Sequence, residues 1–177
     1  MFFDLDCCLV DDFDANLQLM NAAAREFGVA AIDPSSLRAA FSEPVEDQRA
    51  LFFPGADSDI LDRFFQSKLP AYISRISLAV GASETFTALE DRGMGIVVLT
   101  SGRSAITRAI LEGKGLVPHA LIASDDVMGP QPTPGLIFRG CEVLGIAPWE
   151  VLFVGGSDAS WRIAAQAGCL FAGLGQQ

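Results

Sequence analysis

The chain has 177 residues, half of them hydrophobic, which is enough to bury the core of one α/β domain with a small appended module. It carries 22 acidic and 12 basic residues without any basic cluster, which argues against nucleic acid as a partner. No apolar run approaches the roughly 18 residues of a membrane-spanning helix, and the first residues lack the basic start of a signal peptide. We therefore expect a cytoplasmic protein that has no membrane partner.

A short strand is predicted over residues 2–5, and five carboxylates fall within the first fourteen residues. They are Asp4, Asp6, Asp11, Asp12 and Asp14. These side chains could simply be solvated at the start of the chain. However, carboxylates at the end of an apolar strand are costly unless a hard cation neutralises them. The cluster therefore favours a functional site.

Residues 14–75 have a helical pattern that no strand-like alternation interrupts. Apolar residues repeat at helical spacing up to Gly28, which should end the first helix. Asp33, followed by proline, predicts the N-cap of a second helix. Asp57 predicts the N-cap of another helix, which Pro70 should kink or end. This part of the chain is expected to be a small all-helical insert.

After the insert, β-branched runs alternate with helical segments that glycines close. We expect strands over 95–100, 120–123, 151–154 and 169–172, and helices over 83–92, 104–114, 136–144 and 159–167. Strands and helices that alternate through short loops imply right-handed crossovers and a parallel sheet. The predicted fold class is α/β, a parallel sheet flanked by helices over residues 1–13 and 79–177, with the helical insert over 14–78.

Ligands of parallel sheets bind outside the carboxyl ends of the strands. This rule selects several short segments as candidates for the functional site. They are Asp4 with Asp6, Thr100 with Ser101, Asp125 with Asp126, and residues 155–158. A proline-rich loop over residues 129–134 is expected to enter from the same edge.

A first strand that ends in Asp-x-Asp, a helical insert and a later strand that ends in Thr form a specific combination. It resembles the haloacid dehalogenase superfamily, in particular its phosphoglycolate-phosphatase-like branch with a helical cap. The resemblance covers essentially the whole chain and implies a Rossmann-like core. Four segments carry it: residues 3–11 (FDLDCCLVD, where the family has FDLDGTLVD), 96–101 (IVVLTS), 129–134 (GPQPTP, a GKPxP-type segment) and 155–160 (GGSDAS, where the family has GDSxxD).

The resemblance implies phosphoryl transfer from a small phosphorylated metabolite. Asp4 would take the phosphoryl group as an aspartyl phosphate, and Asp6 would act as general acid and base. Thr100 and Ser101 would bind the phosphoryl oxygens. Mg²⁺, held by Asp4 and Asp6, would screen the like charges of carboxylate and phosphate.

The sequence departs from the family pattern at four places in these motifs. Gln131 stands where the family has lysine, so a donor remains but its positive charge is lost. Gly156 and Ser160 replace the two acids of the last motif, and Cys7-Cys8 replaces Gly-Thr. Loss of one preorganised electrostatic group commonly costs about 10²–10³ in rate. We expect a weak phosphatase or a catalytically inactive ligand- or partner-binding protein, and a dehalogenase less, because that chemistry also relies on the lysine.

Some residues could compensate for these losses, but each also has a simpler interpretation. Asp158 could turn toward the metal, although an aspartate at this point is more often an N-cap. Arg103 could reach a phosphate in place of the lysine, although a solvated arginine at a helix start is the usual case. For Asp125 and Asp126, a loop or capping role is expected at least as often as a role in the site.

The remaining reactive and aromatic residues are expected to be structural. Cys8 has no histidine beside it, and neighbouring carboxylates disfavour its thiolate. His119, the only histidine, follows a proline and is interpreted as a loop residue. The aromatic residues of the insert have the helical spacing typical of packing. They are Phe41, Phe52, Phe53, Phe64, Phe65 and Tyr72.

Overall fold

The computed structural model describes residues 1–6, 8–41, 45–129 and 131–174. Cys7 and Pro130, which belong to two of the motif segments, lie outside the described residues. The chain divides into two compact units. The α/β unit comprises Met1–Asp11 and Ser77–Gln177, and the helical unit comprises Asp12–Ile76.

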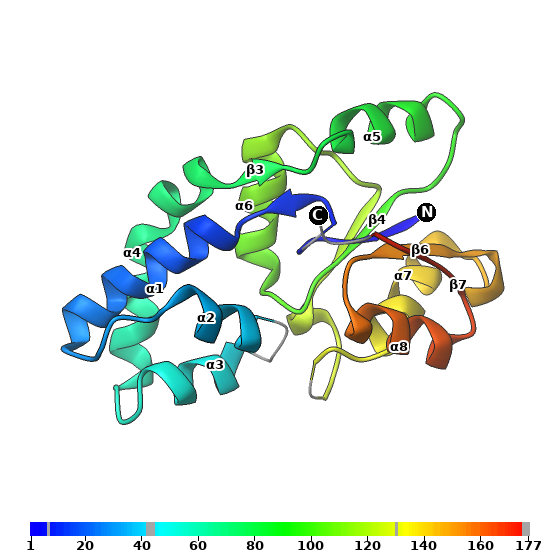
Figure 1. The fold of residues 1–177 in the computed structure, drawn as a ribbon. Coiled ribbons are helices and arrows are strands. Elements are labelled where there is room, and N and C mark those ends of the chain that lie inside the picture. The colour runs from blue at the N-terminus through cyan, green and yellow to red at the C-terminus, as the bar shows by residue number, and fades with distance from the viewer. Residues whose placement is uncertain (7, 42–44, 130, 175–177) are drawn as a thin grey trace. The chain divides into compact units, whose positions relative to one another are not determined.

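The α/β unit is built on a five-stranded sheet (Figure 1), whose order is β5-β4-β1-β6-β7. The strands are β1 (Phe2–Asp4), β4 (Val97–Leu99), β5 (Ala120–Ile122), β6 (Leu152–Gly155) and β7 (Leu170–Gly173). Every neighbouring pair is parallel, and β1 lies at the centre between β4 and β6. This topology confirms the predicted α/β class with a parallel sheet.

Helices connect the parallel strands, as the alternating pattern predicts. They are α5 (Ala82–Glu90), α6 (Ser104–Lys114), α7 (Gly135–Leu144) and α8 (Asp158–Ala167), together with the short 3₁₀ turns η1 (Ser124–Asp126) and η2 (Pro148–Glu150). The bounds of these four helices and of the five strands lie within two residues of those predicted. Gly115, Gly145 and Gly168 end α6, α7 and α8 with positive φ, a conformation in which a side chain would be strained.

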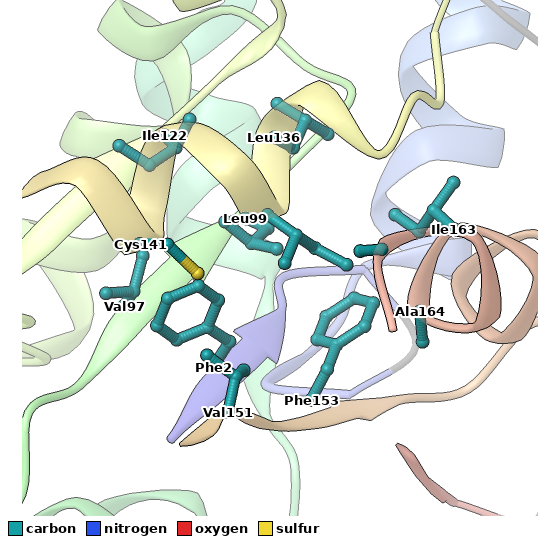
Figure 2. Packing of buried hydrophobic residues seen from close by; sticks show 12 residues of the cluster. Phe2, Val97, Leu99, Ile122, Leu136, Cys141, Val151, Phe153, Ile163 and Ala164 are labelled. Atoms are coloured by element: carbon teal, nitrogen blue, oxygen red, sulfur yellow. The ribbon is translucent and has the colours of Figure 1, made fainter. Parts of the chain in front are cut away.

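Successive side chains of β1 point to opposite faces of the sheet and pack against different helices. Figure 2 shows the fully buried Phe2 beside Phe153, within a cluster to which β4, α7 and α8 also contribute. On the other face, the rings of Phe3 and Phe86 of α5 have centroids 5.6 Å apart. A Cβ on Gly140 of α7 would lie 2.7 Å from a ring carbon of Phe2, so glycine is needed for α7 to approach the sheet.

Two very short strands, which the sequence pattern does not predict, form a separate antiparallel ladder. They are β2 (Val10–Asp11) and β3 (Ser77–Leu78). Val10 pairs with Leu78, and Asp11 pairs with Ser77. The ladder therefore joins the segment that leaves the α/β unit to the segment that re-enters it.

Every element described in the helical unit is a helix, as expected for the insert. The helices are α1 (Phe13–Phe27), α2 (Pro34–Ala40), α3 (Val45–Phe52) and α4 (Ser58–Arg75). Asp33 accepts the backbone N–H groups of the first turn of α2, and Asp57 does the same for α4, so both predicted N-caps are confirmed. The expectation that Pro70 could end its helix is wrong, because α4 continues to Arg75. Proline removes a single intrahelical donor, and α4 packs against α1.

The aromatic residues of the helical unit form its core, as their spacing predicts. Phe53 is buried with Leu37, Leu61 and Met20. Phe41, Phe52, Phe64 and Phe65 are partly buried against this cluster. The hydroxyl of Tyr72 instead donates a hydrogen bond to Asp12 Oδ2 at 2.7 Å. Of the helices that the structure describes, none combines the length and the apolar character that crossing a bilayer requires.

Candidate active site at the carboxyl ends of the strands

The register of the sheet brings the predicted site residues to one edge. Asp4, the last residue of β1, pairs with Leu99 of β4, and Thr100 follows directly. On the other side of β1, strand β6 ends at Gly155 and leads into the loop before α8. The carboxyl ends of the three central strands therefore place Asp4, Thr100 and this loop where a parallel sheet binds its ligands.

The Asp4 carboxylate is half-buried and accepts a hydrogen bond from Ser160 Oγ at 2.5 Å from Oδ2. Burial raises its pKa to about 6, because loss of solvent disfavours the charged form. The Ser160 hydroxyl and the backbone N–H of Leu5 oppose this rise, but they do not cancel it. A carboxyl group with a raised pKa at a strand end is a frequent property of catalytic sites.

The loop after β6 connects Asp4 to the start of α8 through two serines. Ser157 is the N-cap of α8, and its Oγ accepts the backbone N–H of Ser160 at 3.1 Å. The two hydroxyl oxygens lie 2.7 Å apart, and Ser160 is only 3% exposed. The interpretation of Asp158 as the N-cap is wrong. Ser157 has the extended backbone and the aligned hydroxyl of an N-cap, and Asp158 is the exposed first residue of the helix.

The Ser157–Ser160–Asp4 hydrogen bonds are a feature that sequence reasoning missed. It treated Ser160 only as a lost acid. A Ser-x-x-Ser pair at a strand-to-helix junction was a usable signal, because an N-cap serine bonds to the backbone N–H three residues later. That spacing fixes Ser160 in the first turn of the helix. It does not by itself show which distant side chain the Ser160 hydroxyl meets.

Thr100 lies at the end of β4 with 1% of its surface exposed. Its Oγ1 accepts the backbone N–H of Gly102 at 3.0 Å, so the hydroxyl proton remains available for another acceptor. Ser101, the next predicted contact, is exposed. The loop thus presents the hydroxyl groups of Thr100 and Ser101 at the strand end, and the backbone N–H of Gly102 fixes that of Thr100.

Asp125 and Arg103 lie at the start of α6, where Arg103 is exposed at the N-cap position. The carboxylate of Asp125 accepts the backbone N–H of Ser104 at 2.9 Å and its hydroxyl at 2.8 Å. These bonds, the backbone one first, lower the pKa of Asp125, and the charge of Arg103 adds to the effect. Asp126 accepts the N–H of Ala123 at 2.8 Å. Both aspartates therefore have the capping role that was one of their two interpretations.

Asp6 lies in the turn that follows β1. The carbonyl oxygen of Leu5 accepts the N–H groups of Leu9 and Val10 at 3.0 and 3.2 Å, which closes the turn. Asp6 is half-buried and forms an isolated β-bridge with Val10. Asp4 and Asp6 of the Asp-x-Asp pair therefore lie on either side of the end of β1.

Gln131, at the position where the family has lysine, bonds to its own loop. Its Nε2 donates to the carbonyl oxygen of Gly129 at 3.2 Å. Its Oε1 is buried, and no hydrogen-bond partner for it exists in the described part of the chain. No described interaction links Gln131 to Asp4, so Gln131 does not supply the contact that a lysine would make.

Mg²⁺ is held by oxygen ligands in nearly octahedral geometry, usually one or two carboxylates with waters and phosphate oxygens. Over residues 1–6, 8–41, 45–129 and 131–174, no three Asp, Glu, His or Cys side chains gather closely enough to hold a metal ion. Asp4, Asp6 and Asp158 do not form such a group, and Asp4 Oδ2 is engaged by Ser160. The described residues therefore do not form a preformed Mg²⁺ site of three protein ligands.

A cavity of about 420 Å³ lies elsewhere in the α/β unit, beside β5 and helices α6 and α7. Arg108, Arg139 and His119 contribute to its lining, and Asp126 is the candidate site residue that does so as well. His119 is exposed before β5, and its Nδ1 accepts the backbone N–H of Ile96 at 3.1 Å. This contact supports its interpretation as a structural loop residue.

Comparison with known proteins identifies similar sequences and structures. The family model of haloacid dehalogenase-like hydrolases matches residues 1–174. Phosphoglycolate phosphatase of Escherichia coli (strain K12) is 31% identical over 94 residues, which span 52% of this chain but only 37% of that protein. Phosphoglycolate phosphatase of Chromobacterium violaceum is 23% identical over 184 residues, which span 98% of this chain and 83% of that protein.

Two solved structures have a similar fold. CbbY from Rhodobacter sphaeroides, in complex with phosphate, has a TM-score of 0.80 at 17% identity, with 98% of this chain and 85% of that chain covered. A HAD-superfamily hydrolase of subfamily IA, variant 1, from Geobacter sulfurreducens PCA has a TM-score of 0.77 at 23% identity, with 97% and 84% covered. At these identities the likeness concerns the fold alone.

Proposed function

Because the chain belongs to the haloacid dehalogenase-like hydrolase family, we propose that it is a slow phosphomonoesterase that acts on a small phosphorylated metabolite through Asp4. One observation carries the proposal: the Asp4 carboxylate and the Thr100 hydroxyl lie at adjacent strand ends, and Asp6 follows in the next turn. The relatives named phosphoglycolate phosphatase and the phosphate-bound structure of similar fold support this class of substrate.

In the proposed reaction, a carboxylate oxygen of Asp4 attacks phosphorus, and the bond between phosphorus and the ester oxygen breaks. The Asp6 carboxyl group gives its proton to the leaving alkoxide, which departs as the alcohol. The resulting Asp6 carboxylate then takes a proton from water, which attacks the aspartyl phosphate. Inorganic phosphate leaves, and both aspartates return to their initial states.

Binding of the phosphoryl group is assigned to donors near the end of β4. The free proton of the Thr100 hydroxyl would bond to one phosphoryl oxygen, and Ser101 and Arg103 of the same loop would contact others. The Gln131 amide, which the resemblance would place here, donates to its own loop instead. The charge of a lysine and the two acids of the last motif are absent, and each such loss commonly costs about 10²–10³ in rate. Turnover is therefore expected to be slow.

Mg²⁺ is the cofactor that the family resemblance implies, and Asp4 and Asp6 are the carboxylates that would contact it. Because the described donor set does not fit a preformed site, no step of the reaction is assigned to the metal. The assay of the proposed function therefore has arms with and without Mg²⁺.

The test measures phosphate release from a panel of small phosphomonoesters that includes phosphoglycolate. Asp4→Asn should lower release by at least about 10³-fold, because it removes the nucleophile and keeps the shape of the side chain. Asp91→Asn makes the same chemical change at the exposed end of α5 and should leave release unchanged. Equal release by the wild type and by Asp4→Asn would exclude Asp4 as the nucleophile.

A second candidate function is a non-catalytic protein that keeps the fold and binds a ligand or a partner. The hydrogen bond of Ser160 to Asp4 favours it, and so does Gln131, which bonds to its own loop. This candidate predicts no phosphate release by the wild type. The combined substitutions Gln131→Lys, Gly156→Asp and Ser160→Asp should then create it. Robust turnover by the unchanged protein would rule the candidate out.

A further inference from the structure

We infer that Ser160 is a positioning residue that holds the Asp4 carboxylate by hydrogen bonding, with Ser157 behind it, in the place of a metal ion. The bond joins Ser160 Oγ to Asp4 Oδ2 at 2.5 Å, across 156 residues of chain. Among the described residues, no other side chain makes a hydrogen bond to the Asp4 carboxylate, which the backbone N–H of Leu5 also contacts. The inference deepens the proposed function, because it concerns how the same carboxylate is held ready.

The direction of each hydrogen bond follows from the number of protons. A serine hydroxyl has one proton, and that of Ser160 is donated to the Asp4 carboxylate, which can only accept when it is ionised. Across the 2.7 Å contact between the hydroxyls, Ser157 must therefore be the donor and Ser160 the acceptor. Donation from Ser157 polarises the Ser160 hydroxyl and strengthens its bond to the carboxylate.

Packing fixes Ser160 in this position. A Cβ on Gly155 would lie 2.7 Å from Ser160 Cβ and 3.0 Å from its Oγ, so the serine sits directly against the end of β6. The backbone N–H of Ser160 bonds to Ser157 Oγ at 3.1 Å, which holds the first turn of α8. The hydroxyl is thus preorganised by the strand on one side and by the helix cap on the other.

The serine and a metal ion are alternative ways of holding Asp4. A buried carboxylate is stable only when charge or hydrogen bonds compensate its lost hydration. A carboxylate at position 160 would place a second negative charge beside Asp4 and would need a cation between them. Serine supplies a donor without adding charge, so the pair needs no cation.

The first test asks whether Mg²⁺ alone stabilises the protein. In the wild type, millimolar Mg²⁺ should leave the thermal unfolding midpoint where NaCl of equal ionic strength leaves it. Gly156→Asp/Ser160→Asp should unfold at a lower temperature without metal. It should gain roughly 5–10 °C once Mg²⁺ exceeds its dissociation constant about 100-fold.

The matched control is Ala165→Glu/Gln166→Glu, which adds the same two charges at exposed positions of α8. It should show no response specific to Mg²⁺, which separates a metal site from general screening of an acidic protein. A Mg²⁺-specific rise in the wild type would overturn the inference. So would the absence of a rise in a folded Gly156→Asp/Ser160→Asp variant.

A second test remains valid if that double variant does not fold. Ser160→Ala should raise the unfolding equilibrium constant roughly tenfold or more at pH 8, but only about threefold in the Asp4→Asn background, where the acceptor is neutral. With Asp91→Asn instead, the two effects should simply multiply. Equal effects of Ser160→Ala in both Asp4 backgrounds would show that the bond does not hold the carboxylate.

None of these measurements requires turnover. A protein without phosphatase activity can still pass both tests, and an active phosphatase can fail them. Failure of the proposed function and failure of this inference are therefore distinguishable.

Discussion

The loops that follow β4 and β6 both pair a serine with a carboxylate, yet they shift that carboxylate in opposite directions. After β4, Ser104 at the start of α6 donates two hydrogen bonds to exposed Asp125 of the η1 turn, and the pKa of Asp125 is lowered. At the β6 loop, half-buried Asp4 accepts a shorter bond from Ser160, and its pKa is nevertheless raised to about 6. Hydrogen bonding is present in both cases, so burial decides the difference.

The comparison separates two uses of the same chemistry. Beside the β4 loop, the Asp125 carboxylate accepts hydrogen bonds from the first residue of α6 and contributes to stability. In the β6 loop, the hydrogen bond only reduces the cost of holding a charge away from water. A buried carboxylate that costs stability, beside a loop that hydrogen bonds stabilise, is typical of functional sites.

The largest expected effect is the pH dependence that Asp4 imposes. Its folded pKa of about 6 lies above the ordinary value of 3.8, so between these values the folded state binds more protons than the unfolded state. The free energy of unfolding should fall as pH rises from about 4 to about 6, by roughly 3 kcal/mol, and the loss should be complete above that range. Urea unfolding at intervals of pH measures it.

Asp4→Asn is the matched variant for this measurement, because asparagine does not ionise. Its free energy of unfolding should be nearly flat between pH 4 and 7 and should exceed that of the wild type at neutral pH. If the free energy of unfolding of the wild type depended on pH as little as that of the variant, burial would not dominate the pKa of Asp4. The opposite pKa shifts of Asp4 and Asp125 would then not hold.

The next effect compares glycines of the two loops. A Cβ on Gly155 would lie 2.7 Å from Ser160 Cβ and 3.3 Å from a ring carbon of Phe171, whereas one on Gly102 would lie 3.2 Å from Thr100 Oγ1. Gly155→Ala should therefore cost about 1–3 kcal/mol, and Gly102→Ala under about 1 kcal/mol. Thermal unfolding of the two variants shows which substitution costs more stability. A larger cost for Gly102→Ala would show that the backbone is packed less tightly at the end of β6 than after β4.

A smaller effect is expected from the helix caps. Asp125→Ala should cost about 0.5–1 kcal/mol at pH 7, because the N-terminus of α6 loses its acceptor. The pKa of Asp125 is lowered in the folded state, so this contribution is present above its ordinary pKa and is lost as pH falls through the folded pKa. The difference from the wild type should shrink in acid. A difference that persists there would indicate lost packing instead of a lost charged cap.

Ser157→Ala provides the corresponding change at the β6 loop. It removes the N-cap of α8 and should also cost about 1 kcal/mol, whereas Ser157→Asp should restore the cap. Because serine does not ionise in this range, the cost of Ser157→Ala should not follow the acid titration of Asp125. The two caps therefore differ in the pH dependence of their contribution to stability and not in its magnitude.

The smallest effect is expected for Arg103→Gln. Arg103 is exposed, so its loss should change the free energy of unfolding by less than about 0.5 kcal/mol. Its charge contributes to the lowered pKa of Asp125, so the variant should raise that pKa, which a carboxyl NMR titration can follow. A loss of inorganic phosphate binding in the same variant, measured by calorimetry, would instead assign Arg103 to the ligand.

Local patterns were enough to predict the strand ends and most helix bounds. Asp33 and Asp57 cap helices through their own neighbours, and glycines end helices through their own backbone, so each signal lies within a few residues. The two-residue strands β2 and β3 were not predictable, because alternation needs a longer run. The continuation of α4 past Pro70 was not predictable either, since tertiary packing outweighs the local tendency of proline to end a helix.

The candidate site was predicted in part for the same reason. Asp4 and Thr100 follow from strand ends and from the family resemblance, because the topology of a parallel sheet fixes where they meet. The bond between Ser160 and Asp4 joins residues 156 positions apart, and its length depends on how α8 packs against β6. Sequence could show that an acid was missing, but not what had taken over its contact.

The ladder between β2 and β3 has a consequence for modularity. Asp11 and Ser77 face each other across an antiparallel pair, so a two-residue turn such as Asn-Gly between them would close an ordinary β-hairpin. The α/β unit would then be formed by one continuous chain that lacks residues 12–76. The helical segment enters and leaves the α/β unit through two adjacent strands. Evolution or engineering can therefore exchange it without changing the order of the strands around β1.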